Sequence, residues 1–190
     1  PDRSVRSSRG VEQEMKYPVI GIAGKARTGK DTAAAMLLEE FGGYRYAFAD
    51  PIRGMLKAIG VDMSQKLWQD LKEEPIELLG GKSPRYLMQT LGTEWGRLMV
   101  DKDIWLNLAG HYLTHTGPGM IISDVRFANE AEWVRKHGGL IIHLDRPTAI
   151  KVREHESESG VPVEKGDAQI LNESTKEHLR KQLIKAVSPE

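Results

Sequence analysis

Residues 17–41 read YPVIGIA, GKARTGK and DTAAAMLLEEF in turn. The first run is apolar and partly β-branched, the second begins with one glycine and contains another, and the third is rich in helix-forming residues. This order predicts a strand, a turn and a helix. In the turn, Gly24 and Gly29 lie five residues apart and Lys30 follows directly, which is the spacing of a phosphate-binding loop in its expected strand-to-helix context.

The loop predicts a site for the phosphates of a nucleotide. Its glycines let backbone N–H groups turn toward phosphate oxygens, and the helix that follows adds the positive end of its dipole. Lys30 can reach the β- and γ-phosphates, while Lys25 and Arg27 add local positive charge. The alternative is a glycine-rich turn that only connects a strand to a helix and binds nothing. In that case the strand, the glycine spacing, the lysine and the helix would occur together by chance.

The residue after the loop lysine departs from the usual pattern. Ser or Thr normally follows this lysine and supplies a hydroxyl to magnesium, whereas here Asp31 follows it and Thr32 comes next. Two interpretations remain open. Either a small shift of register brings Thr32 to the ion, or Asp31 acts on the ion through water while Thr32 contacts the α-phosphate. We favour the second.

Further apolar runs outside the loop indicate a sheet. They lie at residues 44–49, 120–124 and 140–144, with a last edge strand at 168–171, and helical patterns follow them. Strands that alternate with helices predict an α/β fold with a parallel sheet. Residues 64–116 carry apolar side chains at helical spacing, which predicts a helical segment in the centre of the chain.

The organisation of the chain is expected to be simple. With 39% hydrophobic residues among 190, the chain can bury one sizeable core. We expect a flexible N-terminal extension at residues 1–14, which have few apolar side chains, and one domain over residues 15–190. Within this domain we expect a helical insertion at about 51–116 and a polar lid at about 148–167.

The composition argues against several classes of function. The 27 Lys and Arg residues balance the 27 Asp and Glu residues, so no global field draws the chain to nucleic acid or to a membrane. The absence of cysteine excludes disulfides and thiolate metal clusters. The six histidines, His155 among them, show no zinc spacing. No apolar run approaches the roughly 18 residues of a membrane span, and we expect a soluble, cytoplasmic protein.

The loop GKARTGKDT, with aspartate after the lysine, resembles that of the bacteriophage deoxynucleoside monophosphate kinases and, more distantly, that of the phosphomevalonate kinases. Further segments resemble the phage kinases in the same order over about residues 18–183. They are AFADPIRGML, RYLMQTLGTEWGRLMVDKDIWL, IISDVRFANEAEWVRKHGGLIIHLDRP and HESESGVPVEKGDAQILNEST. The last segment is the most telling, because other phosphate-loop kinases lack it.

This resemblance implies a three-layer α/β phosphate-loop kinase with a helical acceptor-binding insertion and a short lid. It implies that the γ-phosphoryl of ATP is transferred, with Mg²⁺, to a deoxynucleoside monophosphate, giving the diphosphate for phage DNA synthesis in the host cytoplasm. The expected partners are ATP and this monophosphate, and neither nucleic acid nor a membrane is expected as a partner. Whether the protein forms a homodimer is left open. Two alternatives remain: a kinase of another phosphorylated small molecule, such as phosphomevalonate, and a noncatalytic nucleotide-sensing module.

Phosphoryl transfer depends on positioning and on cations around the moving group, so acidic and basic residues at strand ends are the catalytic candidates. Asp124 and Arg126 come at the end of the run at 120–124, where doubly wound sheets bind ligands. Asp124 is predicted to orient magnesium water near Thr32. Arg126 is predicted to clamp phosphate and, with Arg53 and Arg85, to align the acceptor. The alternative is that Asp124 caps the next helix and Arg126 pairs on the surface. Arg146, after the run at 140–144, is predicted to meet ATP when a lid closes.

Two further residues complete the predicted ATP site. Arg153 lies in the polar lid, where its alternative role is a solvated charge. Asn172 resembles the position that meets adenine in the phage kinases, and its alternative role is a turn residue before a helix. The whole predicted ATP set is Gly24, Lys25, Arg27, Gly29, Lys30, Asp31, Thr32, Arg153 and Asn172.

The predicted acceptor site lies in the central helical segment. Asp50 is expected to cap a helix that begins with Pro51, and Arg53 to face the acceptor phosphate from its first turn. Arg85 and Gln89 are four residues apart, hence on one helical face, and are predicted to contact phosphate and base. For these residues a solvated helix face is the alternative.

More distant aromatic and basic residues add weaker candidates for the acceptor site. Arg97 returns to the face of Arg85 if the helix between them is continuous. Trp68 and Trp105 are candidates for stacking on a base, although tryptophans in helical apolar patterns are more often core residues.

Overall fold

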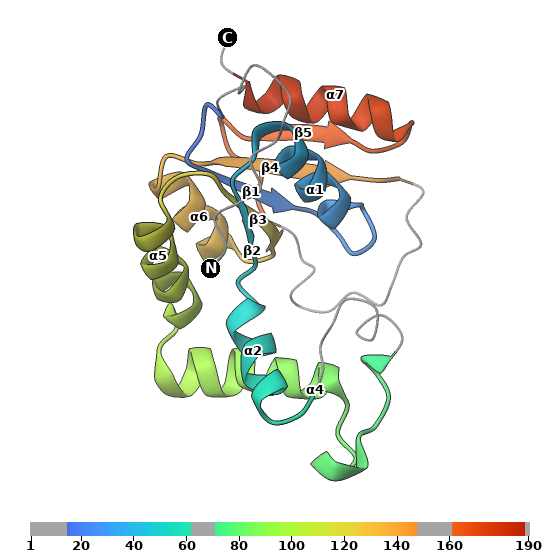
Figure 1. Cartoon of the computed structure of the whole chain (residues 1–190), viewed down its shortest axis with the longest axis vertical. Helices are drawn as coiled ribbons and strands as arrows, with labels where there is room; N and C mark the ends of the chain where they lie inside the picture. Colours follow the sequence, from blue (N-terminus) through green and yellow to red (C-terminus); the bar gives the residue numbers. More distant parts are fainter. Residues whose placement is uncertain (1–14, 62–70, 148–160, 189–190) are drawn as a thin grey trace. The chain divides into compact units, whose positions relative to one another are not determined.

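The computed structural model describes residues 15–61, 71–147 and 161–188 (Figure 1). The chain divides into two compact units, one formed by Pro1–Ala47 with Leu113–Glu190 and the other by Phe48–Tyr112. The predicted extension at residues 1–14 and the predicted lid as far as residue 160 lie outside the described residues.

The first unit is built on a five-stranded sheet whose strands are all parallel, in the order β2-β3-β1-β4-β5. The strands are β1 (Val19–Ala23), β2 (Tyr44–Tyr46), β3 (Met120–Val125), β4 (Leu140–Asp145) and β5 (Ala168–Leu171). The prediction of an α/β fold with a parallel sheet is confirmed. β2 is shorter than the apolar run that predicts it, because Ala49 already serves as the N-cap of the next helix.

Helices cover both faces of this sheet (Figure 1). α1 (Lys30–Phe41) and α7 (Lys176–Val187) pack on one face, where Leu37 and Leu183 join Ile22 in the main hydrophobic core. α6 (Ala128–Lys136) packs on the other face. There a Cβ at Gly21 would lie 3.1 Å from Cγ2 of Val134. The first unit is therefore a three-layer α/β structure.

β3 contains one extra residue opposite β1. Gly21 pairs with Ile122 and Ala23 pairs with Val125, so Ser123 and Asp124 together oppose a single residue of β1. This bulge reverses the usual alternation, and Val125 shares a face with Ile122, since its Cγ2 would meet a Cβ at Gly21 at 3.0 Å. Bulges re-aim side chains near sites, and this one lies where the sequence predicts a magnesium-orienting aspartate.

The strand order places a crevice between β1 and β3. The connection through α1 leads from β1 toward β2, whereas the connection through α6 leads from β3 toward β4, so the chain leaves these neighbouring strands in opposite directions. Ligands of open α/β sheets bind outside the carboxyl ends of the strands at such a point. The loop after β1 and residues 124–127 after β3 therefore flank the expected binding site.

The second unit is helical among its described residues. It contains α2 (Asp50–Ala58), the short 3₁₀-helix η1 (Glu77–Leu79), α4 (Pro84–Gln89), the π-helix η2 (Thr90–Val100) and most of α5 (Ile104–Thr116). The predicted cap of α2 is wrong by one residue: Ala49 is the N-cap, and Asp50 lies in the first turn. The condition set for Arg97, one α-helix from Arg85 onward, is not met, because α4 passes directly into the π-helix after Gln89.

Candidate active site

The loop after β1 has the backbone of a phosphate cradle. Gly29 is the N-cap of α1 in a left-handed conformation with φ of 100°, and Gly24 has φ of 150°. A Cβ at Gly24 would lie 2.3 Å from the carbonyl oxygen of Leu144, so only glycine fits here. The Thr28 hydroxyl, which is buried, donates to the carbonyl oxygen of Lys25 at 2.9 Å and closes the loop from inside.

Lys30 turns its ammonium group back onto this loop. Its Nζ donates to the carbonyl oxygens of Gly24 and Lys25, both at 2.7 Å. Because Lys30 also begins α1, the ammonium and the N-terminal backbone N–H groups of the helix lie at the same end of the loop. An anion bound there meets both the lysine and the positive end of the helix dipole.

Asn172 supports the loop from the end of β5. Its Nδ2 donates to the carbonyl oxygen of Thr28 at 2.8 Å, and its backbone N–H donates to the carbonyl oxygen of Asp145 at 2.7 Å. A Cβ at Gly29 would lie 2.8 Å from the same Nδ2. The side chain that resembles an adenine contact thus bonds to the phosphate loop itself.

The first turn of α1 carries the two residues that replace the usual hydroxyl position. The Asp31 carboxylate forms an ion pair with Arg45 of β2 at 3.5 Å, and its side chain remains 65% exposed. Thr32 is exposed beside it. Both oxygen-bearing side chains therefore remain open to solvent and to a ligand.

The end of β3 brings acidic, hydroxyl and basic groups next to each other along the chain. Asp124 is half-buried, and Ser123 is 2% exposed with a hydroxyl that has no hydrogen-bond partner among the described residues. Asp124 does not cap α6. The N-cap is Phe127, and the Glu130 carboxylate accepts the backbone N–H groups of Arg126 and Phe127 at 2.8 and 3.1 Å.

One cavity of about 360 Å³ joins these parts within the first unit. Its lining combines the phosphate loop, the ends of β3 and β4, and two valines that follow the undescribed segment. The lining residues are Gly24, Lys25, Ala26, Lys30, Val125, Arg126, His143, Leu144, Asp145, Val161 and Val163. The structure thus brings Lys25, Lys30 and Arg126 to one cavity, and cations around a cavity at a strand end suit a phosphorylated ligand.

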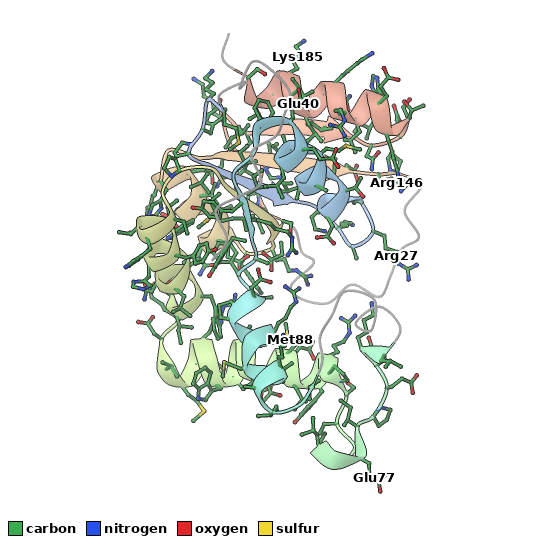
Figure 2. All side chains as sticks on the ribbon, viewed as in Figure 1. Arg27, Glu40, Glu77, Met88, Arg146 and Lys185 are labelled. Carbon is green, nitrogen blue, oxygen red and sulfur yellow. The ribbon has the colours of Figure 1, made fainter. Side chains whose placement is uncertain are left out.

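Other predicted ATP residues lie at the same edge without lining the cavity. Arg27, with φ of 64°, is on the loop after β1, and Arg146 follows β4, as Figure 2 shows. The Arg146 backbone N–H donates to Oδ1 of Asp145 at 2.8 Å. Arg153 lies outside the described residues.

An ionic network next to the cavity was not predicted from the sequence. Asp167, whose side chain is 3% exposed, accepts from Nη2 of Arg135 at 2.7 Å, from Nε of Arg135 at 3.1 Å and from the Glu164 backbone N–H at 2.9 Å. Nε2 of His143 lies 2.8 Å from the same carboxylate. Arg135 also pairs with Glu164 at 2.7 Å.

The network sets the charge of its central carboxylate. Burial raises the pKa of Asp167, but hydrogen bonds from Arg135, from the Glu164 backbone and from His143 outweigh that effect, so the pKa lies below its ordinary value. The hydrogen bond to Asp167 raises the pKa of Arg135. Asp167 is therefore ionised at neutral pH and accepts hydrogen bonds only.

Apart from Arg126, which lies in the first unit, the predicted acceptor residues that the structure describes lie in the second unit. Arg53 pairs with Asp50 at 2.7 Å, and Arg85 forms an ion pair with Glu73. Arg85 and Gln89 are both in α4 and share a face, as predicted.

The two tryptophan candidates have different outcomes. Trp105 is 2% exposed and donates from Nε1 to the carbonyl oxygen of Gly92 at 2.8 Å, so it takes the core position that was the alternative to base stacking. A Cβ at Gly96 would lie 2.4 Å from the Trp105 ring, which explains why position 96 is a glycine. Trp68 lies outside the described residues.

Two features are absent from the part of the chain that the structure describes. No three His, Cys, Asp or Glu side chains gather there as a metal site. None of the described helices is long and apolar enough to cross a lipid bilayer.

Comparison with known proteins gives matches along most of the chain. The sequence profile of the deoxynucleotide monophosphate kinases matches residues 18–81 and 77–183. A protein of Acanthamoeba polyphaga mimivirus whose name provisionally gives it this activity is 29% identical over 184 residues, covering 89% of this chain and 95% of that protein. The deoxynucleotide monophosphate kinase of Escherichia phage RB69 is 31% identical over 124 residues, covering 63% of this chain and 51% of that protein.

Solved structures support the fold. The shikimate kinase of Aquifex aeolicus shares 12% identity with a TM-score of 0.50, over 88% of this chain and 94% of that one. At this identity the likeness concerns the fold alone.

Proposed function

Because the chain belongs to the deoxynucleotide monophosphate kinase family, we propose that it transfers the γ-phosphoryl of ATP to a deoxynucleoside 5'-monophosphate. The observation that carries this proposal is the phosphate loop: Lys30, the N-terminus of α1 and a cation-lined cavity meet at the switch point of a parallel sheet. This arrangement holds the donor phosphates and leaves one side of them open to an acceptor.

The loop and the end of β3 divide the work on the donor. Lys30 and the loop N–H groups bind the β- and γ-phosphates, and Arg126 neutralises the moving phosphoryl group from the opposite side of the crevice. Lys25, Arg27 and Arg146 add positive charge at the same strand edge, and Arg153 belongs to this proposed set. Asn172 acts on the donor by holding the carbonyl of Thr28 and hence the shape of the loop.

The residues present fit a magnesium ion. Protein sites for MgATP use one or two carboxylates together with phosphate oxygens and water, so no cage of protein ligands is required. Asp124 and Ser123, whose hydroxyl has no partner in the part of the chain that the structure describes, lie in the β3 bulge, and Asp31 and Thr32 lie in the first turn of α1. When bound, the ion supplies positive charge to the β- and γ-phosphates. We propose that Thr32 and Asp124 hold it, partly through water, which takes the interpretation with Thr32 at the ion in place of the one favoured from the sequence alone.

The second unit is proposed to bind the acceptor. Arg53 and Arg85 each have a carboxylate neighbour, and an acceptor phosphate is a dianionic partner that can take over such a guanidinium. Gln89, on the face of Arg85, offers an amide to a base edge.

The experiment that tests this function is ADP release from MgATP with a panel of possible acceptors. The panel contains the deoxynucleoside monophosphates, the matching ribonucleoside monophosphates and phosphomevalonate. Stimulation by deoxynucleoside monophosphates supports the proposal. Stimulation only by phosphomevalonate, or ATP binding with no acceptor that stimulates, would replace it with a different kinase or a nucleotide sensor.

A further inference from the structure

His143 is a titratable residue of the cavity that the proposed mechanism does not use. It lies in β4, next to β1, and its register partner is Ala23, the last residue before the phosphate loop. Its side chain is 14% exposed and contributes to the lining of the same cavity as Lys30 and Arg126. The imidazole therefore borders the cavity and is mostly withdrawn from open solvent.

The imidazole is held by the buried Asp167 carboxylate. The distance from Nε2 of His143 to Oδ2 of Asp167 is 2.8 Å. Because Asp167 is ionised and can only accept, Nε2 carries the proton of this hydrogen bond. Nδ1 is then the ring nitrogen that remains for a ligand. The hydrogen bond to the Asp167 carboxylate fixes the orientation of the imidazole ring at the cavity.

The segment that contains Asp167 is secured without His143. Arg135 binds the carboxylate through two nitrogens and also donates to the carbonyl oxygen of Pro162 at 3.2 Å, and the Glu164 backbone N–H supplies a further hydrogen bond. The hydrogen bond to His143 therefore adds little that this segment needs. It does determine how the ring of His143 is held at the cavity.

We propose that His143 is a further nucleotide-binding residue, which donates from Nδ1 to a phosphate oxygen in this cavity while Asp167 acts as its positioning residue. This inference rests on the proposed function, because it takes the ligand of the cavity to be a nucleotide. With Nε2–H bound to Asp167, Nδ1 donates to the phosphate when the imidazole carries a second proton.

The charges around His143 support a phosphate as the second anion. Asp167 and Arg135 flank the ring on the side of α6, so one negative and one positive charge nearly compensate there. The charged residues of the cavity are Lys25, Lys30, Arg126 and Asp145. Three cations against one carboxylate attract phosphate.

The test compares phosphate binding with nucleoside binding. Inorganic tripolyphosphate and adenosine are titrated by calorimetry into the unmodified chain and into His143→Gln, which keeps a hydrogen-bonding side chain but cannot carry charge. We expect tripolyphosphate to bind about tenfold more weakly to His143→Gln, with adenosine unchanged, as for loss of a charge-assisted hydrogen bond. His178→Gln, at an exposed position in α7, is the matched control and should leave both affinities unchanged.

A spectroscopic measurement covers the case in which His143→Gln does not fold. In the unmodified chain, tripolyphosphate should move the ¹⁵N shift of Nδ1 of His143 toward the imidazolium value, and Asp167→Asn should reduce that change. Unchanged tripolyphosphate affinity in a folded His143→Gln, or an unmoved Nδ1 signal at saturating tripolyphosphate, would overturn the inference. Lys30→Ala separates the two proposals: weaker binding to Lys30→Ala beside unchanged binding to His143→Gln rejects only the role of His143, whereas unchanged binding to both variants rejects the proposed function as well.

Discussion

Lys30 is the residue on which the proposed activity depends most directly. Its ammonium donates to two carbonyl oxygens of its own loop, which are neutral acceptors. Phosphate oxygens are ionised and form stronger hydrogen bonds with an ammonium group. We expect nucleotide binding to draw Nζ from the carbonyls to the phosphates.

Lys30→Ala should therefore lower the rate of phosphoryl transfer by about 10²–10³-fold, because it removes a cation aimed at developing charge. The thermal midpoint should change little, since the lost hydrogen bonds are exposed. The measurement is turnover in steady-state assays together with a thermal melt. Lys185→Ala, an exposed lysine of α7 (Figure 2), is the control, and equal activity in both variants would contradict the role of Lys30.

The contribution of Asp167 to the free energy of unfolding is predicted to depend on pH. Its pKa in the folded chain is lowered, so ionisation stabilises the fold at any pH above the unfolded value of about 3.9, and that stabilisation is lost as the pH falls through the folded pKa. Asp167→Asn should lower the free energy of unfolding by about 1.5–3 kcal/mol at pH 7. The deficit should shrink below about pH 4, as measured by urea unfolding at several pH values. A deficit that is constant with pH would argue against the ionic network.

Residues close in sequence were easier to predict than residues brought together by folding. Gly24, Gly29 and Lys30 are recognisable because their function depends on spacing within one turn. The network of Asp167, His143 and Arg135 joins positions 24 and 32 residues apart, and no local pattern marks such pairs. A histidine within the apolar run of β4 and an aspartate directly before β5 are the signals that could have suggested it.

At the scale of elements, the phosphate loop is stabilised by its neighbours. β4 closes against Gly24 through the carbonyl of Leu144, and the turn after β5 reaches the loop through Asn172. The loop is thus supported by two strands that follow it by more than 100 residues. A substitution at either strand end should therefore change the affinity of the loop for phosphate.

Asn172→Ala tests this support against a direct contact with adenine. If Asn172 acts through the carbonyl of Thr28, the variant should bind ATP and tripolyphosphate more weakly by the same factor, about fivefold for the loss of one hydrogen bond. If it meets adenine, only the affinity for ATP should fall. Calorimetric titration of both ligands distinguishes the two roles, and selective loss of ATP affinity would contradict the supporting role.

The elements themselves were largely predictable, with informative exceptions. Alternating apolar runs and helical patterns predict all five strands and the helices between them. The bulge at Ser123 and Asp124 was not predicted, because one extra residue leaves the apolar pattern of β3 intact. The π-helix Thr90–Val100 was not predicted either, since its apolar spacing resembles that of an α-helix over so few turns.

At the scale of the whole molecule, donor and acceptor residues are assigned to different units. The phosphate loop, Asp124 and Arg126 belong to the first unit, whereas Arg53 and Arg85 belong to the second. Each unit has its own core: α1 and α7 pack on the sheet in one, and Leu56 and Val61 pack with α4 residues in the other. This division predicts that substitutions can weaken the binding of one substrate without changing the binding of the other.

Arg85→Ala should raise the KM for the deoxynucleoside monophosphate about tenfold and leave the Kd for ATP unchanged, because it removes a cation proposed for the acceptor alone. Lys102→Ala is the control in the same unit, since its side chain is 87% exposed. The measurements are the initial rate against the acceptor for its KM and a calorimetric titration of ATP for its Kd. A rise in the Kd for ATP with an unchanged acceptor KM would contradict the assignment of the second unit.

The most direct test of the central claim is transfer of the label from γ-³²P-ATP to each deoxynucleoside monophosphate, with products separated by chromatography and Lys30→Ala as the blank. We predict a labelled deoxynucleoside diphosphate for at least one base, formed together with an equal amount of ADP and absent from the blank. Label that appears only as inorganic phosphate, or a labelled diphosphate that forms equally with Lys30→Ala, would contradict the assignment of this chain as a phosphate-loop kinase of deoxynucleotides.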